Sequence, residues 1–455
     1  MRMINNALTG ANAAQVALNA ASQNIANVMT PGYSRQGVVL TTRQPGGGDP
    51  LSPGYGVEVS AVRRFSDDYK NLMQWQAGSN LGALSAAQPY YAQLEQVLGT
   101  AGTSLSGGFD KFFAALNAAS LDSGVMREQV LREADALAQR FNNLDGVLAS
   151  QLDAIREQRN ATVTQINSLT GNLAELNLKL AAGRAQGINV SGLEDERDRQ
   201  IDALSALVEV KVLEVSDGSK TISLSNGLPL VAAGEAARLS NESHADGSQT
   251  LKLAFAQDKY AMPGGELGGQ LGGLNQFEKD VARPMVAKVR VLAGELATRV
   301  NEQLAKGFDM NGQPGKPLFV FDPGAASGVL RTSGLKSAEL GFSGDKDKPG
   351  NNDNLRTLIE VKSQTFDLAG VGQVTLGDAY SQMLGQLAVA SQQNKGGLDT
   401  AKVIRAEAEK NWQGTSGVNR DEEAINLIEF QKMYQANMKV ISVANQLFDS
   451  TLAIL

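Results

Sequence analysis

The last forty residues, 416–455, constrain the fold more than any other stretch of the chain. From Asp421 onward they contain no glycine or proline, and the three carboxylates at 421–423 stand where a helix would have the positive end of its dipole. Apolar residues recur every three or four positions, close to heptad spacing. They are Leu427, Phe430, Tyr434, Met438, Ile441, Phe448, Leu452 and Leu455, with Asn445 in the same register. The pattern predicts a long helix whose stripe is buried, either on its own domain or against another helix.

A second, weaker stripe lies at the other end of the chain. It consists of Ile4, Leu8, Ala11, Gln15, Leu18, Ser22 and Ile25. Small side chains let helices approach closely but bury little area, so a helix of this kind needs a partner. We expect it to end near residues 24–27, because Pro31 and Gly32 in the Thr-Pro-Gly-Tyr segment that follows enforce a turn.

Both ends carry motifs that resemble a known family. Residues 17–36 contain an Asn-Ile-Ala-Asn helix end, the Thr-Pro-Gly-Tyr turn and a Ser-Arg-Gln continuation. The C-terminal stretch contains Gly-Val-Asn, an acidic pair, Gln-x-x-Tyr-Gln-Ala-Asn and Leu-Phe-Asp. Together they resemble the signatures of bacterial flagellar axial proteins, and in particular the hook-associated protein 1 (FlgK) family of the hook–filament junction. Two positions depart from the family pattern: Arg420 replaces a usual apolar residue, and Met29 a common asparagine.

The resemblance implies a mainly α fold with inserted β structure, in which the terminal helices form an antiparallel coiled coil. Three domains are expected. Residues 1–33 and 416–455 would form the coiled-coil domain of the axial core. Residues 34–206 and 267–415 would form a helical bundle with short β elements, and 207–266 a small β-rich outer domain. A strand pair predicted within 34–64 would be the joint beside the coiled coil.

The resemblance also implies a structural subunit and not an enzyme, which joins hook to filament through coupled folding of its two terminal helices. The expected partners are the hook protein, the second junction protein (hook-associated protein 3), further copies of the chain in a ring, and a cytoplasmic export chaperone at the C-terminal helix. The residues expected to make assembly contacts or to shape the turn are Ile4, Leu8, Leu18, Asn24, Ile25, Asn27, Pro31, Gly32, Tyr33, Leu427, Phe430, Tyr434, Met438, Ile441, Phe448 and Leu452.

Composition narrows the functional classes. The 455 residues carry a net charge of −7 and no basic block, which argues against a nucleic-acid partner. No apolar run approaches the roughly 20 residues that cross a membrane, and the N-terminus lacks the apolar core of a cleaved secretory signal. These features alone would indicate a cytoplasmic protein, but the family resemblance implies export to the extracellular flagellum through the flagellum's own type III channel. The absence of cysteine leaves stability to packing.

Patterns in the middle of the chain predict its elements. A helical run extends from about Val125 to Leu180, with Gly146 and Gly171 expected to be sites of close approach inside it. Pro89 is expected to kink or break an earlier helix. Strand patterns fill 208–231, where Asp-Gly (217–218) and Asn-Gly (226–227) predict hairpin turns.

No residue pattern favours a catalytic, metal or cofactor site. The charge cluster at 193–200 is interpreted as a helix surface with Asp195–Arg199 and Glu194–Arg197 pairs. The glycine-rich 268–274 lacks the Lys-Ser/Thr of a P-loop, and residues 308–312 lack the ligand spacing of a calcium loop. With no cysteine and His244 as the single histidine, Cys/His chemistry is excluded. Two alternatives stay open: a flagellar rod or hook subunit, and an assembly-associated peptidoglycan hydrolase that uses two carboxylates.

Overall fold

The computed structural model describes residues 2–43, 54–100, 104–119, 124–245, 247–262, 267–325 and 328–453. Residues 45–50 and 263–265, whose prolines and glycines predict turns, and Leu455 of the C-terminal stripe lie outside these residues. The chain divides into two compact units. The first contains 1–82, 163–269 and 400–455, and the second contains 83–162 and 270–399. This division places the terminal helices and the β segment in one unit, so the three-domain division stays a prediction.

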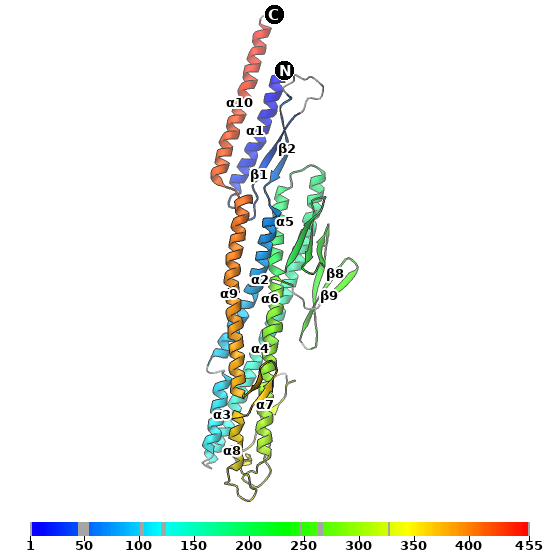
Figure 1. Cartoon of the computed structure of the whole chain (residues 1–455). Coiled ribbons are helices and arrows are strands. Elements are labelled where there is room, and N and C mark those ends of the chain that lie inside the picture. The colour runs from blue at the N-terminus through cyan, green and yellow to red at the C-terminus, as the bar shows by residue number, and fades with distance from the viewer. Residues whose placement is uncertain are drawn as a thin grey trace. The chain divides into compact units, whose positions relative to one another are not determined.

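Two helices from opposite ends of the chain lie side by side in the first unit. They are α1 (Arg2–Ala26) and α10 (Arg420–Leu452), and they run antiparallel (Figure 1). Gly10 faces Asn437, where an added Cβ would lie 2.6 Å from the side-chain oxygen of Asn437. The predicted pairing of the two ends is confirmed in this form. Asn419 caps α10 by accepting a hydrogen bond from the backbone N–H of Asp421 at 3.0 Å.

A β-hairpin follows α1 and packs on it. Strand β1 (Gln36–Thr42) pairs antiparallel with β2 (Val57–Arg64), and both contact α1. Gly56 has a φ of +92°, and a Cβ at this position would lie 2.1 Å from the hydroxyl oxygen of Thr9. A side chain there is excluded both by the backbone conformation and by the contact with α1.

The rest of the first unit combines long helices with a β segment. The helices are α5 (Ser191–Leu207), the first part of α2 (Asp68–Gly99) and the ends of α4 (Gly124–Ala185) and α9 (Leu376–Ser416). The strands form sheets of order β3-β4-β5-β6 and β7-β8-β9. They are β3 (Val210–Glu214), β4 (Lys220–Leu224), β5 (Pro229–Ala232), β6 (Glu235–Ala236), β7 (Arg238–Ser243), β8 (Gln249–Phe255) and β9 (Asp258–Met262). The predicted Asp-Gly and Asn-Gly turns are confirmed, with φ of +83° at Gly218 and +89° at Gly227.

The second unit is a helical bundle with short strands. Its elements include α3 (Leu105–Ala119), α6 (Gly269–Phe277), the π-helical turn Glu278–Ala282, α7 (Arg283–Ala305), β10 (Phe319–Phe321), β11 (Leu330–Thr332), α8 (Asp353–Glu360), β12 (Phe366–Leu368) and β13 (Gly372–Val374). Short 3₁₀ turns lie at Ser337–Glu339 and Val361–Ser363. The core is built around buried phenylalanines of α3, with Phe112 and Phe113 at most 1% exposed. This unit therefore has an ordinary hydrophobic core of its own.

Three sequence predictions meet a mixed outcome here. Pro89 lies inside α2 and does not end it. Residues 308–312 form a turn, in which the carboxylate of Asp309 accepts hydrogen bonds from the N–H groups of Asn311 and Gln313 at 2.7 and 2.8 Å. Gly146 and Gly171 lie inside α4 as expected, but no other described part of the chain lies within 4 Å of a Cβ built at either. The prediction that they are close-approach sites within the chain is wrong.

No described helix is long and apolar enough to cross a membrane.

Gly82 is a close-approach site that gives a test of the packing. A Cβ built at Gly82 would lie 2.1 Å from the carbonyl oxygen of Ala206, at the end of α5. We expect Gly82→Ala to lower the free energy of unfolding by about 1–3 kcal/mol, because the backbone of α5 has to shift. Gly171→Ala is the matched control and should raise stability by roughly 0.5–1 kcal/mol. Thermal or urea unfolding checks both, and equal effects of the two changes would contradict this packing.

Candidate assembly surface and joint

Helix α1 buries a face made of small side chains. The buried residues are Ala7, Ala11, Ala13, Ala14, Ala17, Ala20, Ala21 and Asn24. Arg2 is the single charged residue in this helix. Of the predicted stripe, Ile4 and Leu18 are half-buried, while Leu8 is 49% and Ile25 37% exposed. The face that α1 buries is therefore its alanine face, and the larger apolar residues lie along the edge of the contact.

Helix α10 buries its stripe only in part. Leu427, Phe430, Tyr434 and Ile441 are half-buried. Met438 is 43% exposed, and Phe448 and Leu452 are more than half exposed. Near its C-terminal end α10 extends past the start of α1 (Figure 1). The last two turns of the stripe therefore lack a partner within the described chain.

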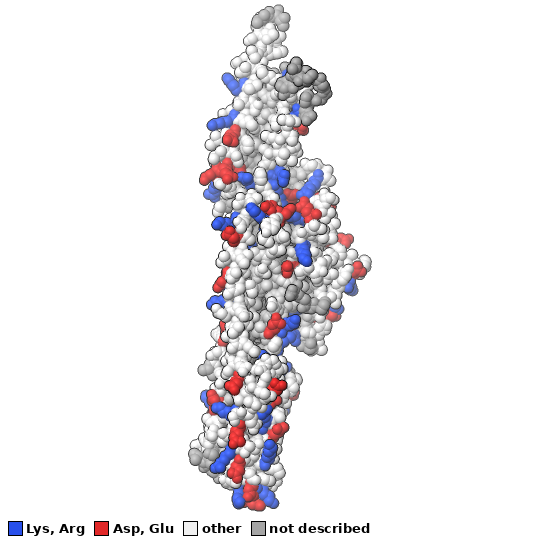
Figure 2. Space-filling model, viewed as in Figure 1, with Lys and Arg blue, Asp and Glu red and all other residues white. Residues whose placement is uncertain are grey.

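Helix α10 also has exposed apolar residues outside the predicted stripe. They are Ile425, Ile428, Val440, Val443 and Leu447, the second apolar face of this helix. The sequence prediction missed them because it followed one stripe, although their own three-, four- and seven-residue spacing carries the same signal. A helix that is apolar on two sides is normally buried on both. In Figure 2 the visible end of this pair is almost free of charged side chains. The surface is therefore suited to contacts with other protein chains.

The turn after α1 is held by one buried amide. Asn24 is 1% exposed; its Nδ2 donates to the carbonyl of Gln36 at 2.8 Å, and its Oδ1 accepts from the N–H of Gln36 at 2.9 Å and from the hydroxyl of Tyr33 at 3.0 Å. Burial, with the nearby charges of Asp195 and Glu423, raises the pKa of Tyr33 to about 12. The phenol is thus a stable donor at neutral pH.

The other predicted turn residues have local roles. Asn27 donates to the carbonyl of Gln23 at 2.9 Å and accepts from the hydroxyl of Thr30 at 3.2 Å. Gly32 has a φ of +75°, a conformation that favours glycine. Pro31 is exposed. The turn is consequently closed by short-range hydrogen bonds, and Asn24 connects it to β1.

The segment after the turn is tied to the break between α9 and α10. The N–H of Arg35 donates to the carbonyl of Ser416 at 2.7 Å, and the Arg35 guanidinium lies 2.8 Å from the carboxylate of Glu422. The same guanidinium lies over the ring of Phe65, 4.5 Å from its centre. These contacts therefore hold the segment that follows α1 against the segment that precedes α10.

A buried ionic cluster fastens β2 to α5. Arg64 lies 2.9, 3.0 and 2.6 Å from the carboxylates of Glu194, Asp195 and Asp198. Lys220 lies 2.9 Å from Asp198. The predicted helix-surface pairs Asp195–Arg199 and Glu194–Arg197 are wrong, because these acids turn inward; Arg199 pairs with Glu196 instead. Local spacing could not show this, since Arg64 lies 131 residues before Asp195.

The pKa shifts distinguish the acids of this cluster. Burial raises the pKa of Asp195 and outweighs its hydrogen bonds from Ser34 and Arg64. Burial would also raise the pKa of Asp198, but the charges of Lys220, Arg64 and Arg197 lower it below its ordinary value. Asp198 is therefore the carboxylate on which the charge balance of the cluster depends.

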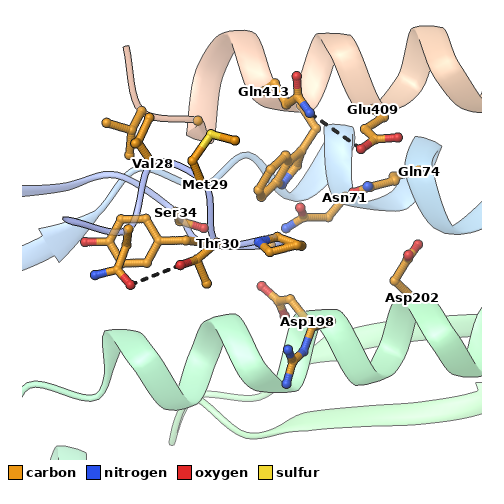
Figure 3. A pocket seen from close by; sticks show the side chains of 18 of the residues that line it. Val28, Met29, Thr30, Ser34, Asn71, Gln74, Asp198, Asp202, Glu409 and Gln413 are labelled. Carbon is orange, nitrogen blue, oxygen red and sulfur yellow. Dashed lines mark hydrogen bonds between the residues drawn. The ribbon is translucent and has the colours of Figure 1, made fainter. Parts of the chain in front are cut away.

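A cavity of about 500 Å³ lies between the turn and the helices α2, α5 and α9 (Figure 3). Trp75 and Trp412, the two tryptophans of the chain, both line it, and Met29 at its edge is 79% exposed. Its inner carboxylates are already paired: Asp198 as above, and Asp202 with Arg405 at 2.6 and 2.7 Å. This arrangement resembles a packed joint more than a pair of free acids for glycan hydrolysis.

The ionic cluster gives a second prediction. Asp198→Asn leaves Arg64, Arg197 and Lys220 with too little negative charge in a buried site, and we expect it to cost about 3–5 kcal/mol of stability. Asp195→Asn should cost less, about 1–2 kcal/mol, because burial already disfavours the charged form of Asp195. Urea unfolding of the two variants measures the difference. A cost for Asp195→Asn equal to or above that for Asp198→Asn would contradict the assignment.

Comparisons with known proteins identify families that this chain matches. Residues 91–319, half of the chain, match the family model described as the flagellar hook-associated protein FlgK helical domain. Residues 413–454 match the model described as the flagellar basal body rod FlgEFG protein C-terminal.

Whole-chain relatives agree with these matches. Flagellar hook-associated protein 1 of Salmonella typhimurium is 26% identical, with 99% of each chain covered. The protein of the same name from Bacillus subtilis is also 26% identical, over 97% of this chain and 95% of the relative. The solved structure of the flagellar hook junction protein FlgK from Burkholderia pseudomallei has a TM-score of 0.68 at 16% identity and covers 77% of this chain and 100% of that one. That likeness concerns the fold.

Proposed function

This chain belongs to the flagellar hook-associated protein FlgK family, and on that premise we propose that it is a structural subunit of the bacterial flagellum that joins hook to filament. The observation that carries the proposal is the terminal helix pair, which is apolar on its outer faces and is joined to an otherwise complete fold. The rod-type match at 413–454 covers the end of α9 and α10, whereas the FlgK match covers half of the chain and favours the junction over the rod or hook.

The proposed location is the extracellular flagellum, reached through the flagellar export channel. The hook protein, hook-associated protein 3 and further copies of this chain in a ring are the proposed neighbours. An export chaperone would cover the apolar faces of α10 before assembly. The paired carboxylates of the joint give no support to the hydrolase alternative, and we propose a non-enzymatic role.

We further propose that the terminal pair orders fully only on assembly. The alanine face of α1 buries little area, and small apolar contacts alone stabilise an isolated helix pair weakly. Neighbouring subunits would cover the second face of α10 and the stripe beyond the start of α1. The monomer would thereby be kept from polymerising before export.

Leu427→Asp with Phe430→Asp tests the assembly role of α10. Both side chains are half-buried, so the double change should destabilise the helix pair by about 3 kcal/mol or more. Electron microscopy of cells that carry this variant as their sole copy should show hooks without filaments. The purified variant should keep the unfolding transition of the second unit.

The matched control is Gln435→Asp with Gln446→Asp, which adds the same charge to α10 at two exposed polar positions. Its effect on filament attachment should be smaller. Normal filaments on cells with the Leu427/Phe430 variant would contradict the proposed role of α10.

A further inference from the structure

A second cavity, of about 490 Å³, lies between the end of α1, the start of β1 and the first turns of α10. Ala21, Val38, Phe65 and Phe430 give it apolar walls. Glu423 also lines it, as the second of two adjacent acids. Arg35, Gln36, Glu422 and Asn426 line it as well, so the recess is of mixed polarity, with two carboxylates and one guanidinium in its wall.

Glu423 is a buried residue whose carboxylate lines the cavity and has no partner among the described residues. The residue is 3% exposed, and its side chain forms no hydrogen bond or ion pair with any residue of the described ranges. Arg35, the cation beside it, is paired with Glu422. The N-terminal dipole of α10 favours a negative charge at this position, and a cation at contact distance would stabilise the unpartnered carboxylate further.

The outer face of α10 presents a cation of the required kind. Lys432 is exposed and makes no ion pair within the described part of the chain, and it follows Ile425 and Ile428 along the second apolar face. Nine residues separate Lys432 from Glu423, which amounts to about half a turn around the helix axis and about 13 Å along it. One copy therefore presents the lysine and the carboxylate on opposite sides.

We propose that Lys432 of one copy enters this cavity and pairs with Glu423 of the next copy. A donor and an acceptor on opposite sides of one helix make a heterologous contact, which repeats from copy to copy and closes into a ring. The long aliphatic stem of lysine fits the apolar walls while its ammonium reaches the carboxylate. The inference rests on the proposed function, since it names the contact through which copies of this chain meet.

Disulfide cross-linking tests this contact. Because the chain has no native cysteine, only the introduced cysteines can form disulfides within or between its copies. Cells would produce Glu423→Cys/Lys432→Cys as their sole copy, and isolated flagella would be oxidised. We expect a ladder of covalent multimers that disappears with reductant. The single variants and the pair Glu423→Cys/Lys439→Cys, whose second position lies about two turns further along α10, are the controls and should stay monomeric.

A charge exchange keeps the test decisive if cysteine disturbs the helix pair. Glu423→Lys and Lys432→Glu should each lower the fraction of cells with filaments at least tenfold, and the combined variant should restore most of it. Flagella that carry filaments but give no ladder, or a combined variant no better than the single ones, would overturn the contact and leave the proposed function intact. Normal filament attachment in cells that lack the chain would instead overturn the proposed function.

Discussion

The antiparallel packing of α1 against α10 is the interaction on which the proposed assembly role depends. It brings together residues from the two ends of the chain, and the small side chains of α1 let the helices approach closely, as Gly10 does against Asn437. Closely packed alanines fit together well in shape, but they remove little apolar area from water. The pair consequently retains exposed Ile, Val, Leu and Phe side chains on α10. A contact that is well shaped but weak is what a subunit needs if it is to stay unassembled first and assemble later.

The joint beside this pair uses the opposite chemistry. The joint is held together by directional hydrogen bonds and ion pairs, which are made by Asn24, Arg35 and Arg64. Apolar helix faces tolerate sliding and rotation, whereas a buried guanidinium among three carboxylates has one satisfactory arrangement. Within the first unit, specificity of position therefore comes from the polar joint, and the capacity for association comes from the apolar pair.

Much of this architecture was predictable from the sequence, and the failures have common causes. Long periodic stripes predicted the terminal helices and α4, and Asp-Gly and Asn-Gly predicted the hairpin turns. The alanine face of α1 was missed because small residues give almost no hydrophobic signal, even though they pack best. The ionic cluster was missed because spacing rules consider neighbours within one helix, and the partners of Asp195 and Asp198 come from distant strands.

The most direct measurement is electron microscopy of flagella from cells that lack this chain. The account predicts finished hooks without filaments and flagellin released into the medium, because nothing would join the two structures. Absent hooks would contradict it in favour of a rod or hook component. Normal filaments would contradict the junction role altogether.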